Sequence, residues 1–370
     1  MKLTIQRDSL LTACQLVGSA VAARTTKPIL AHMKAVAKDD ALVLMGTDTE
    51  VGIRYELRGV GVKRAGSAIL PPGRLIAILR ESADPEVAVE GTEAHTVVKT
   101  STGKFELPAH PADEFPDIPE LDAGGYYHEI AAGVLKTMIR RTAFAADKKE
   151  GTRWAVTGVL WEAEKDKARL VDTDTKRLAM VEGPAVVHGT PEGKTPPLIP
   201  TKAITLLDRN LGDDAEPIQI ALRPNGAMFQ TGRWLIHTKL VEGKFPPYKD
   251  IIPKKAMAKV RLDPAAFASR VRQAAIMTDD ESKRVDFDFQ PGKVTLQARG
   301  AETGSSEVDL ALDGFDGPAV EIAFDPQYLL EMFRAVEGEP SVTLEMTDGQ
   351  KPAVFRIGDN YLYLVMPMGG

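Results

Sequence analysis

Cysteine is almost absent from the sequence, because Cys14 is the only one among 370 residues. A single cysteine excludes any disulfide within the chain, so the fold must form without covalent cross-links. Cys14 falls in an apolar stripe at helical spacing with Leu10, Leu11 and Val17. We therefore expect a buried, unreactive thiol at this position rather than a catalytic nucleophile.

Long apolar runs are also missing from the sequence. None approaches the ~18–20 residues that a membrane-spanning helix needs. The stretch MKLTIQRDSLL, residues 1–11, carries charged and polar groups where a signal peptide has its apolar segment. An apolar fraction of 44% and a charged fraction of 26% are typical of soluble globular proteins. We therefore expect a cytoplasmic protein with no membrane partner.

No constellation of residues typical of an enzyme is present. The histidines show no metal-ligand spacing and lie at positions 32, 95, 110, 128, 188 and 237. The phosphate-binding loop, the dinucleotide fingerprint and the nucleophile elbow are also missing. We therefore predict no catalytic residue, no metal and no cofactor. The net charge of −6 disfavours a protein that simply coats nucleic acid, but it allows a local basic surface.

One motif keeps an enzymatic alternative open. The stretch VDTDTKRL, residues 171–178, contains Asp172 and Asp174, and such a D-x-D pair could serve a metal-dependent transferase of nucleotide sugars. However, the triplet Thr-Asp-Thr also occurs at residues 47–49, which places Asp48 and Asp174 126 residues apart. Because the triplet is repeated, we expect both aspartates to secure turns by accepting backbone N–H bonds.

Signals for helix starts recur at almost the same interval. They precede amphipathic segments and lie at Pro71, Pro200 and Asp325, with gaps of 129 and 125 residues. Three more amphipathic segments each follow a short alternating strand and cover residues 7–23, 131–147 and 263–279. Asp8 and Asp263 are the predicted N-caps of the first and third of these helices. A chance recurrence of helix signals is the alternative to a true repeat.

Short strands bounded by Gly, Asp and Asn fill the intervals between the helices. The sequence therefore predicts an α+β protein made of three copies of a unit of about 125 residues. Each unit is expected to have two helices packed on antiparallel sheets. The predicted domains are 1–122, 123–254 and 255–370.

Five stretches in fixed order carry a family resemblance. They are MKLTIQRDSLL (1–11), RTTKPIL (24–30), TDTKRLA (173–179), KLVEGKFPPY (239–248) and LVMPM (364–368). Together they resemble the bacterial beta sliding clamp, the processivity subunit of the replicative DNA polymerase. The resemblance implies the DNA clamp fold and a head-to-tail homodimeric ring. It also implies that the ring encircles double-stranded DNA without reading its sequence and catalyses no reaction.

The resemblance implies that the polymerase III core, the clamp loader and other clamp-binding DNA enzymes dock through short peptides. The positions that match the family's peptide groove are Val156, Thr173, Thr175, Lys176, Arg177, Leu178, Pro246, Ile251, Tyr328, Leu364, Met366, Pro367 and Met368. Flexible Met and Leu side chains suit a surface that accepts several related peptides. The chain departs from the family at Thr175, Lys176, Asp250 and Gly369-Gly370, which bears on the specificity of the groove.

Basic residues recur on the predicted helices of all three units, which suits loose contact with phosphates. The predicted DNA-binding residues are Arg24, Arg74, Arg80, Lys136, Arg140, Arg141, Lys148, Lys149, Arg153, Lys202, Arg270 and Arg272. Arg24, Lys148, Lys149 and Arg153 are included because they match DNA-contacting loops of the family. For each cation on a helix the alternative is an ordinary solvated helix face. A repeat scaffold that binds proteins but no DNA is the matching alternative function.

The resemblance also implies that an edge strand of the first domain contacts the third domain of a partner subunit. The matching positions are Lys104, Phe105 and Leu107 on one side and Ile276 and Met277 on the other. Apolar contacts should dominate this interface, because exposed ion pairs contribute only ~0–1 kcal/mol each.

Overall fold

The computed structural model describes residues 1–22, 24–92, 95–108, 110–121, 125–147, 156–189, 196–212, 215–279 and 283–369. Three of the predicted DNA-binding residues, Lys148, Lys149 and Arg153, lie outside these ranges. The chain forms two compact units. Unit 1 comprises Met1–Ala132, Val187–Lys194 and Thr205–Leu240, and unit 2 comprises Gly133–Val186, Thr195–Ile204 and Val241–Gly370.

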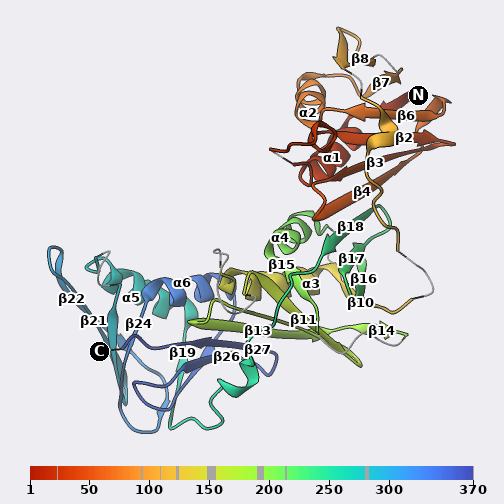
Figure 1. Cartoon of the computed structure of the whole chain (residues 1–370). Helices are drawn as coiled ribbons and strands as arrows, with labels where there is room; N and C mark the ends of the chain where they lie inside the picture. The colour runs from red at the N-terminus through yellow and green to blue at the C-terminus, as the bar shows by residue number, and fades with distance from the viewer. Residues whose placement is uncertain are drawn as a thin grey trace. The chain divides into compact units, whose positions relative to one another are not determined.

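Strands and helices follow one another in three similar series (Figure 1). The first series is β1 (Lys2–Gln6), α1 (Arg7–Gly18), β2 (Met33–Lys38), β3 (Ala41–Thr47), β4 (Val51–Arg58), β5 (Gly61–Arg64), β6 (Gly66–Leu70), α2 (Pro72–Glu81), β7 (Glu86–Gly91), β8 (His95–Lys99) and β9 (Lys104–Pro108). The second is β10 (Tyr127–Ala131), α3 (Ala132–Thr142), β11 (Gly158–Glu164), β12 (Lys167–Thr173), β13 (Arg177–Pro184), β14 (Val186–His188), β15 (Leu198–Pro200), α4 (Thr201–Asn210), β16 (Pro217–Arg223), β17 (Gly226–Gln230) and β18 (Trp234–Lys239).

The third series is β19 (Ala258–Leu262), α5 (Pro264–Ala275), β20 (Val285–Gln290), β21 (Lys293–Gly300), β22 (Gly304–Ala311), β23 (Phe315–Asp316), β24 (Val320–Phe324), α6 (Pro326–Ala335), β25 (Val342–Met346), β26 (Ala353–Ile357) and β27 (Tyr361–Val365). Four 3₁₀ helices occur in the described residues, at η1 (Pro28–Ala31), η2 (Ala112–Glu114), η3 (Ala143–Ala145) and η4 (Tyr248–Asp250).

Each series runs strand, helix, five strands, helix and three strands, which confirms the predicted threefold repeat with two helices per copy. The longest helices have 12 residues, and no helix in the described ranges is long and apolar enough to cross a membrane.

The strands form four sheets. The second series shares one of these sheets with the first series and another with the third. In unit 1 the strand orders are β5-β1-β7-β8-β9 and β14-β10-β16-β17-β18-β4-β3-β2-β6. In unit 2 they are β15-β11-β12-β13-β27-β26-β25-β19-β23 and β22-β21-β20-β24. The first and second series therefore meet at β4–β18, and the second and third meet at β13–β27. Both junctions are antiparallel strand pairs, so the backbone itself joins neighbouring copies.

The helix starts agree with the sequence in most places. Asp263 caps α5 by accepting the backbone N–H of Ala266 at 2.8 Å, and Asp325 caps α6 by accepting that of Gln327 at 2.8 Å. The Asp8 prediction was wrong, because α1 begins at Arg7 directly after β1. Asp8 lies in the first turn instead, where its charge favours the positive end of the helix dipole.

Apolar side chains fill the space between helices and sheets in each unit. In unit 2, Phe267 of α5 packs against Phe287, Phe289 and Phe333, with ring centroids 5.4–6.4 Å apart. In unit 1, Cys14 of α1 is completely buried, and burial raises the pKa of its thiol, as expected for an unreactive cysteine.

Asp172, near the end of β12, is a buried carboxyl group inside this core. Its Oδ1 accepts the backbone N–H of Thr173 at 3.0 Å, and its Oδ2 has no hydrogen-bond partner among the described residues. Burial raises the pKa of Asp172 well above its usual range. The folded protein therefore holds this proton at pH values where the unfolded chain has lost it.

Stability should fall as the pH rises above ~4, the ordinary pKa of aspartate, because the folded state binds more protons than the unfolded state. The isosteric substitution Asp172→Asn removes this titration. We expect the variant to have a higher thermal midpoint than the parent at pH 7 and an equal one near pH 4. Asp313→Asn, at an exposed position, is the control and should change neither value. A lower midpoint for Asp172→Asn at pH 7 would show that the group is charged in the fold.

Candidate functional site

The stretch between β12 and β13 forms a tight turn held by its own side chains. Asp174 Oδ1 accepts the backbone N–H groups of Lys176 at 2.9 Å and Arg177 at 3.0 Å. Thr173 Oγ1 accepts the N–H of Thr175 at 3.0 Å and donates to the carbonyl of Arg177 at 2.5 Å. These bonds confirm the predicted role of Asp174 as a turn residue.

The same turn occurs between β3 and β4. Asp48 Oδ1 accepts the N–H groups of Glu50 at 3.0 Å and Val51 at 2.8 Å, and Thr47 Oγ1 accepts that of Thr49 at 2.9 Å. Thr49 and Thr175 both adopt positive φ angles, of 80° and 76°. A non-glycine residue in this conformation costs roughly 1–3 kcal/mol. The repeated triplet is therefore a repeated turn.

The D-x-D alternative finds no support in this geometry. Asp172 is completely buried, and Asp174 uses one oxygen on two backbone N–H groups and the other on Arg177 Nε at 3.0 Å. Across the residues that the structure describes, no group of three or more His, Cys, Asp and Glu side chains could hold a metal ion.

Arg177 fastens the turn to helix α6. Its guanidinium donates to Asp174, to the Glu331 carboxylate, and through Nη2 to the carbonyl of Phe144 at 2.9 Å. It also lies over the ring of Tyr328 with 4.6 Å to the centroid, and over that of Phe144 with 5.5 Å. Because Arg177 is buried, it positions the turn rather than offering its charge to a ligand.

Apolar side chains lie beside this turn on the neighbouring strands. Leu178 of β13 and Leu364 of β27 are register partners, and both belong to one cluster with Tyr248. Ile252 packs against this cluster, and its neighbour Ile251 is 44% exposed. In the C-terminal segment, Met366 is 39% exposed. Seven residues of the predicted peptide-binding set are exposed or half-buried, namely Thr175, Lys176, Pro246, Ile251, Met366, Pro367 and Met368. We keep the name peptide groove for these seven residues, as the surface that the sequence predicts to bind peptides.

The C-terminal segment is fixed to the groove by backbone bonds. The N–H of Met366 donates to the carbonyl of Lys176 at 2.8 Å, and the N–H of Met368 donates to the carbonyl of Ala323 at 2.8 Å. The first bond places Met366 beside the β12–β13 turn, and the second ties Met368 to β24. Pro367 and Met368 line a pocket together with residues of β20 and β24.

The other predicted groove residues are less accessible. Five of them are buried, namely Val156, Thr173, Arg177, Leu178 and Leu364. Arg177 and Leu178 are consecutive in β13, so their side chains point to opposite faces of the sheet. Tyr328 belongs to α6, and its ring lies beside the guanidinium of Arg177. Its backbone carbonyl accepts a hydrogen bond from the hydroxyl of Tyr363 at 3.0 Å.

Two aromatic residues were missed by the sequence analysis. Phe144 stacks beside Arg177, and Tyr248 packs in the cluster while its hydroxyl donates to Glu162 Oε2 at 3.0 Å. Tyr248 closes the KFPPY motif, so an aromatic residue after two prolines was the signal that could have identified it.

The predicted DNA-binding residues divide into exposed and buried members. The exposed ones lie after α1 or on α2 to α5 and are Arg24, Arg74, Arg80, Lys136, Arg140, Lys202 and Arg272. Arg270 on α5 is half-buried and donates to the side chain of Gln273 at 3.0 Å.

Arg141 contradicts the prediction. It is only 7% exposed, forms an ion pair with Glu339, and lies 5.6 Å from the ring centroid of Tyr361. Position 141 follows the core residue Met138 by three, which places it on the core side of α3. Arg141 therefore links α3 to the segment after α6 and is not available to phosphates.

The predicted interface residues lie at two sheet edges. Phe105 of β9 is 41% exposed, and Lys104 beside it is also exposed. Leu107 is buried within unit 1, so the expectation of an exposed apolar contact there was wrong: the side chain already packs in its own core.

In unit 2, Ile276 follows α5 and is 70% exposed, whereas Met277 is half-buried. Both lie beside the edge strand β22, because Thr303 Oγ1 donates to the carbonyl of Met277 at 2.7 Å and Ser306 Oγ donates to that of Ala274 at 2.8 Å.

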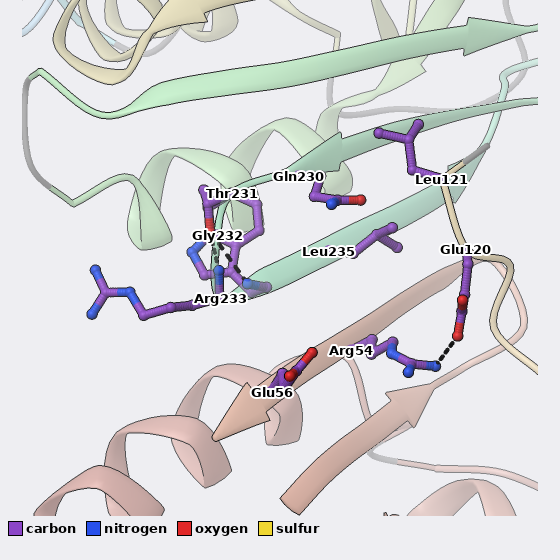
Figure 2. Close-up of a pocket in the computed structure, with 10 residues that line it drawn as sticks. Arg54, Glu56, Glu120, Leu121, Gln230, Thr231, Gly232, Arg233 and Leu235 are labelled. Atoms are coloured by element: carbon purple, nitrogen blue, oxygen red, sulfur yellow. Dashed lines mark hydrogen bonds and ion pairs between the residues drawn. The ribbon is translucent and has the colours of Figure 1, made fainter. Parts of the chain in front are cut away.

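A polar pocket of about 200 Å³ opens in unit 1, and none of the predicted site residues line it. Figure 2 shows Arg54 directed at Glu120, with which it forms an ion pair at 2.5 Å. Thr231 Oγ1 accepts the backbone N–H groups of Arg233 at 3.1 Å and Trp234 at 3.2 Å. These polar groups are used within the fold, and we assign the pocket no function.

Family models match almost the entire chain. They describe the DNA polymerase III beta subunit and match its N-terminal domain over residues 1–119, its central domain over 129–247 and its C-terminal domain over 249–369.

Individual relatives agree with these matches. The beta sliding clamp of Caulobacter vibrioides is 30% identical over 382 residues, and that of Pseudomonas putida is 29% identical over 371 residues; each comparison covers 100% of both chains. The crystal structure of the DNA polymerase sliding clamp from Bacillus subtilis superimposes with a TM-score of 0.93 at 26% identity, covering 100% of this chain and 99% of that one. The beta subunit of DNA polymerase III from Pseudomonas aeruginosa gives 0.92 at 28%, with both chains fully covered.

The order of strands and helices, the paired turns and the assembled C-terminal surface thus occur in a chain that is similar to these clamps from end to end. The protein belongs to the DNA polymerase III beta subunit family, the bacterial beta sliding clamps.

Proposed function

We propose that this sliding clamp works as a head-to-tail homodimeric ring that encircles duplex DNA and tethers replication enzymes to it. The ring reads no base sequence, catalyses no reaction and acts in the cytoplasm. Its partners are the DNA polymerase III core, the clamp loader and other DNA enzymes that carry a clamp-binding peptide. The family matches support a division of the chain into domains 1–122, 123–254 and 255–370.

The strand pairing at the two junctions is the observation that carries this proposal. β4, β13 and β22 are each the fourth strand of their series, and β9, β18 and β27 are each the last. The fourth strand of the first series pairs with the last strand of the second, and that of the second pairs with the last strand of the third. In the described sheets, β22 and β9 are the counterparts left at sheet edges.

The same rule applied between two chains pairs β22 of one subunit with β9 of the next. Such a contact is head-to-tail, and in the proposed dimer two copies of it close the ring. Each edge also carries exposed apolar groups, Phe105 at β9 and Ile276 beside β22. An unpaired edge strand promotes unwanted association, and pairing it in an interface removes that hazard.

The basic residues support the DNA-binding part of the proposal. Exposed Arg or Lys side chains occur on α2, α3, α4, α5 and α6, so every series contributes cations from its helices. Long, exposed side chains on helices suit weak contacts with phosphates that change easily as the ring moves. Net charge is −6, so the remaining surface must be acidic, which disfavours non-specific coating of DNA.

The groove supports the tethering part. Ile251, Met366, Pro367 and Met368 place flexible apolar groups at the surface beside a rigid turn. Exposed apolar patches of this kind mark interaction sites, and methionine adapts to different apolar partners.

The decisive experiment separates encirclement from ordinary binding. The loaded protein should stay on nicked circular DNA and be lost when the circle is cut, because only topological linkage depends on the absence of ends. In solution it should sediment at about twice the 40.1 kDa of one chain. A monomer that ignores DNA topology would instead favour a repeat scaffold that binds proteins but no DNA.

The interface can be tested by the substitution Phe105→Arg. It places a charge on an edge that we expect to be buried in the dimer, and so the protein should sediment as a folded monomer that is not retained on circular DNA. Val186→Arg is the matched control, because Val186 is 59% exposed and lies outside the proposed interface. A Phe105→Arg protein that still sediments as a dimer would contradict the assignment.

The groove can be tested with Ile251→Arg and Met366→Arg together. Charges at these two exposed positions should weaken binding of a short peptide rich in Gln, Leu and Phe by at least about tenfold. The dimer and its retention on circular DNA should be unchanged. Met257→Arg, at a methionine that is 60% exposed elsewhere in unit 2, is the control. Unchanged peptide affinity in the double variant would place the binding surface elsewhere.

A further inference from the structure

A second apolar pocket adjoins the peptide groove in unit 2, and we call it the side pocket. It has a volume of about 510 Å³, within the ~300–1,000 Å³ typical of ligand sites. Leu160 of β11 and Leu198 of β15 line it from the sheet. Phe245, Pro246 and Tyr248 line it from the loop that precedes and enters η4.

The loop makes the side pocket continuous with the groove. Pro246 belongs to both surfaces, and Ile251 of the groove follows directly on η4, with its N–H donating to the carbonyl of Tyr248 at 3.3 Å. Leu160 and Leu198 belong to the same buried cluster as Leu178 of β13 and Leu364 of β27. A peptide that lies in the groove therefore reaches the side pocket by crossing a single loop.

Glu162 and Tyr248, the two polar side chains of the side pocket that are not exposed, are already paired. The Tyr248 hydroxyl donates to Glu162 Oε2 at 3.0 Å, and Arg169 Nη1 donates to the same oxygen at 2.6 Å. Arg169 Nε also donates to Glu182 Oε1 at 2.8 Å. Burial, reinforced by the Glu162 carboxylate, raises the pKa of Tyr248, so its hydroxyl remains a donor. The pocket thus has a fixed shape and offers apolar surface rather than free hydrogen-bonding groups.

The rim of the side pocket carries more positive than negative exposed charge. Lys244 and Lys249 are exposed cations, and Asp250 is the exposed carboxylate among the lining residues. Lys249 Nζ lies 3.8 Å from Glu162 Oε1 and 5.6 Å from the ring centroid of Tyr248, so it is held close to the loop. Lys244 is the cation best placed to meet a charge that arrives with a ligand.

We propose that the side pocket binds an additional apolar side chain of the same partner peptide that occupies the groove, with an acidic neighbour that meets Lys244. The proposal rests on the proposed tethering function and deepens it. Partners would then be sorted in two steps. Residues in the groove identify a clamp-binding peptide, and residues in the side pocket rank the peptides that compete for it.

The test compares peptides on the full-length chain. A short labelled peptide rich in Gln, Leu and Phe reports the groove alone. Two longer peptides add Glu-Trp at one end or the other, and two more add Lys-Trp. Affinities are measured by fluorescence polarisation for the parent, for Lys244→Glu and for Phe245→Ala, with Lys254→Glu as the matched control because Lys254 is exposed but does not line the pocket.

One Glu-Trp peptide should bind the parent about tenfold more tightly than the short peptide, and the matching Lys-Trp peptide should gain less. Lys244→Glu and Phe245→Ala should each remove most of that gain while leaving the short peptide's affinity within about twofold. Lys254→Glu should leave both affinities unchanged. Thermal midpoints show whether Phe245→Ala is folded. Lys244→Glu changes an exposed side chain, so it tests the side pocket without altering the core.

Four results would overturn the proposal. No gain from any longer peptide would show that the side pocket is not used, although binding of the short peptide would leave the groove intact. A gain that survives both pocket substitutions would place the extra contact elsewhere. A changed sedimentation mass in the pocket variants would mark the side pocket as a contact between copies of the chain. Failure of the short peptide itself to bind would remove the groove and the side pocket together.

Discussion

Antiparallel pairing of β4 with β18 and of β13 with β27 is the constraint on which the rest of the structure depends. Each pair extends a sheet across the junction between two copies of the repeat, so main-chain hydrogen bonds fix the register of one copy against the next. The β13–β27 pair also brings Leu178 opposite Leu364. The same backbone bonds that join the copies thus bring together core residues that are far apart in the sequence.

Polar side chains reinforce this junction from the other face of the sheet. Arg177 forms an ion pair with Glu331, and Arg141 forms one with Glu339. In each pair the arginine comes from the second series and the carboxylate from the third. Buried ion pairs need such partners and neighbouring aromatic rings, because an isolated buried charge would be strongly destabilising. The arrangement ties the β12–β13 turn to α6 and to the segment after α3.

Periodicity predicted the repeat, the helix starts at Pro71, Pro200 and Asp325, and the turns at Asp48 and Asp174, because these features depend on residues close together in sequence. Prediction failed where distant segments decide the outcome. The sequence predicted Arg141 as a surface cation, but in the structure it pairs with Glu339 and lies beside Tyr361. The sequence placed Leu107 at the interface, but its side chain is buried within unit 1. Phe144 and Tyr248 went unnoticed for the same reason, since their roles come from partners in other strands and helices.

An interface that pairs the end of one chain with the start of the next does not limit the number of subunits by itself. Each added subunit repeats the same rotation, and closure requires that the rotations sum to a full circle. In the proposed ring, the junctions at β4–β18 and β13–β27 contribute to that rotation, so they matter beyond the stability of a single chain. If a shift of register at either one left the rotations short of a full circle, an open helical filament with unpaired ends would replace the ring.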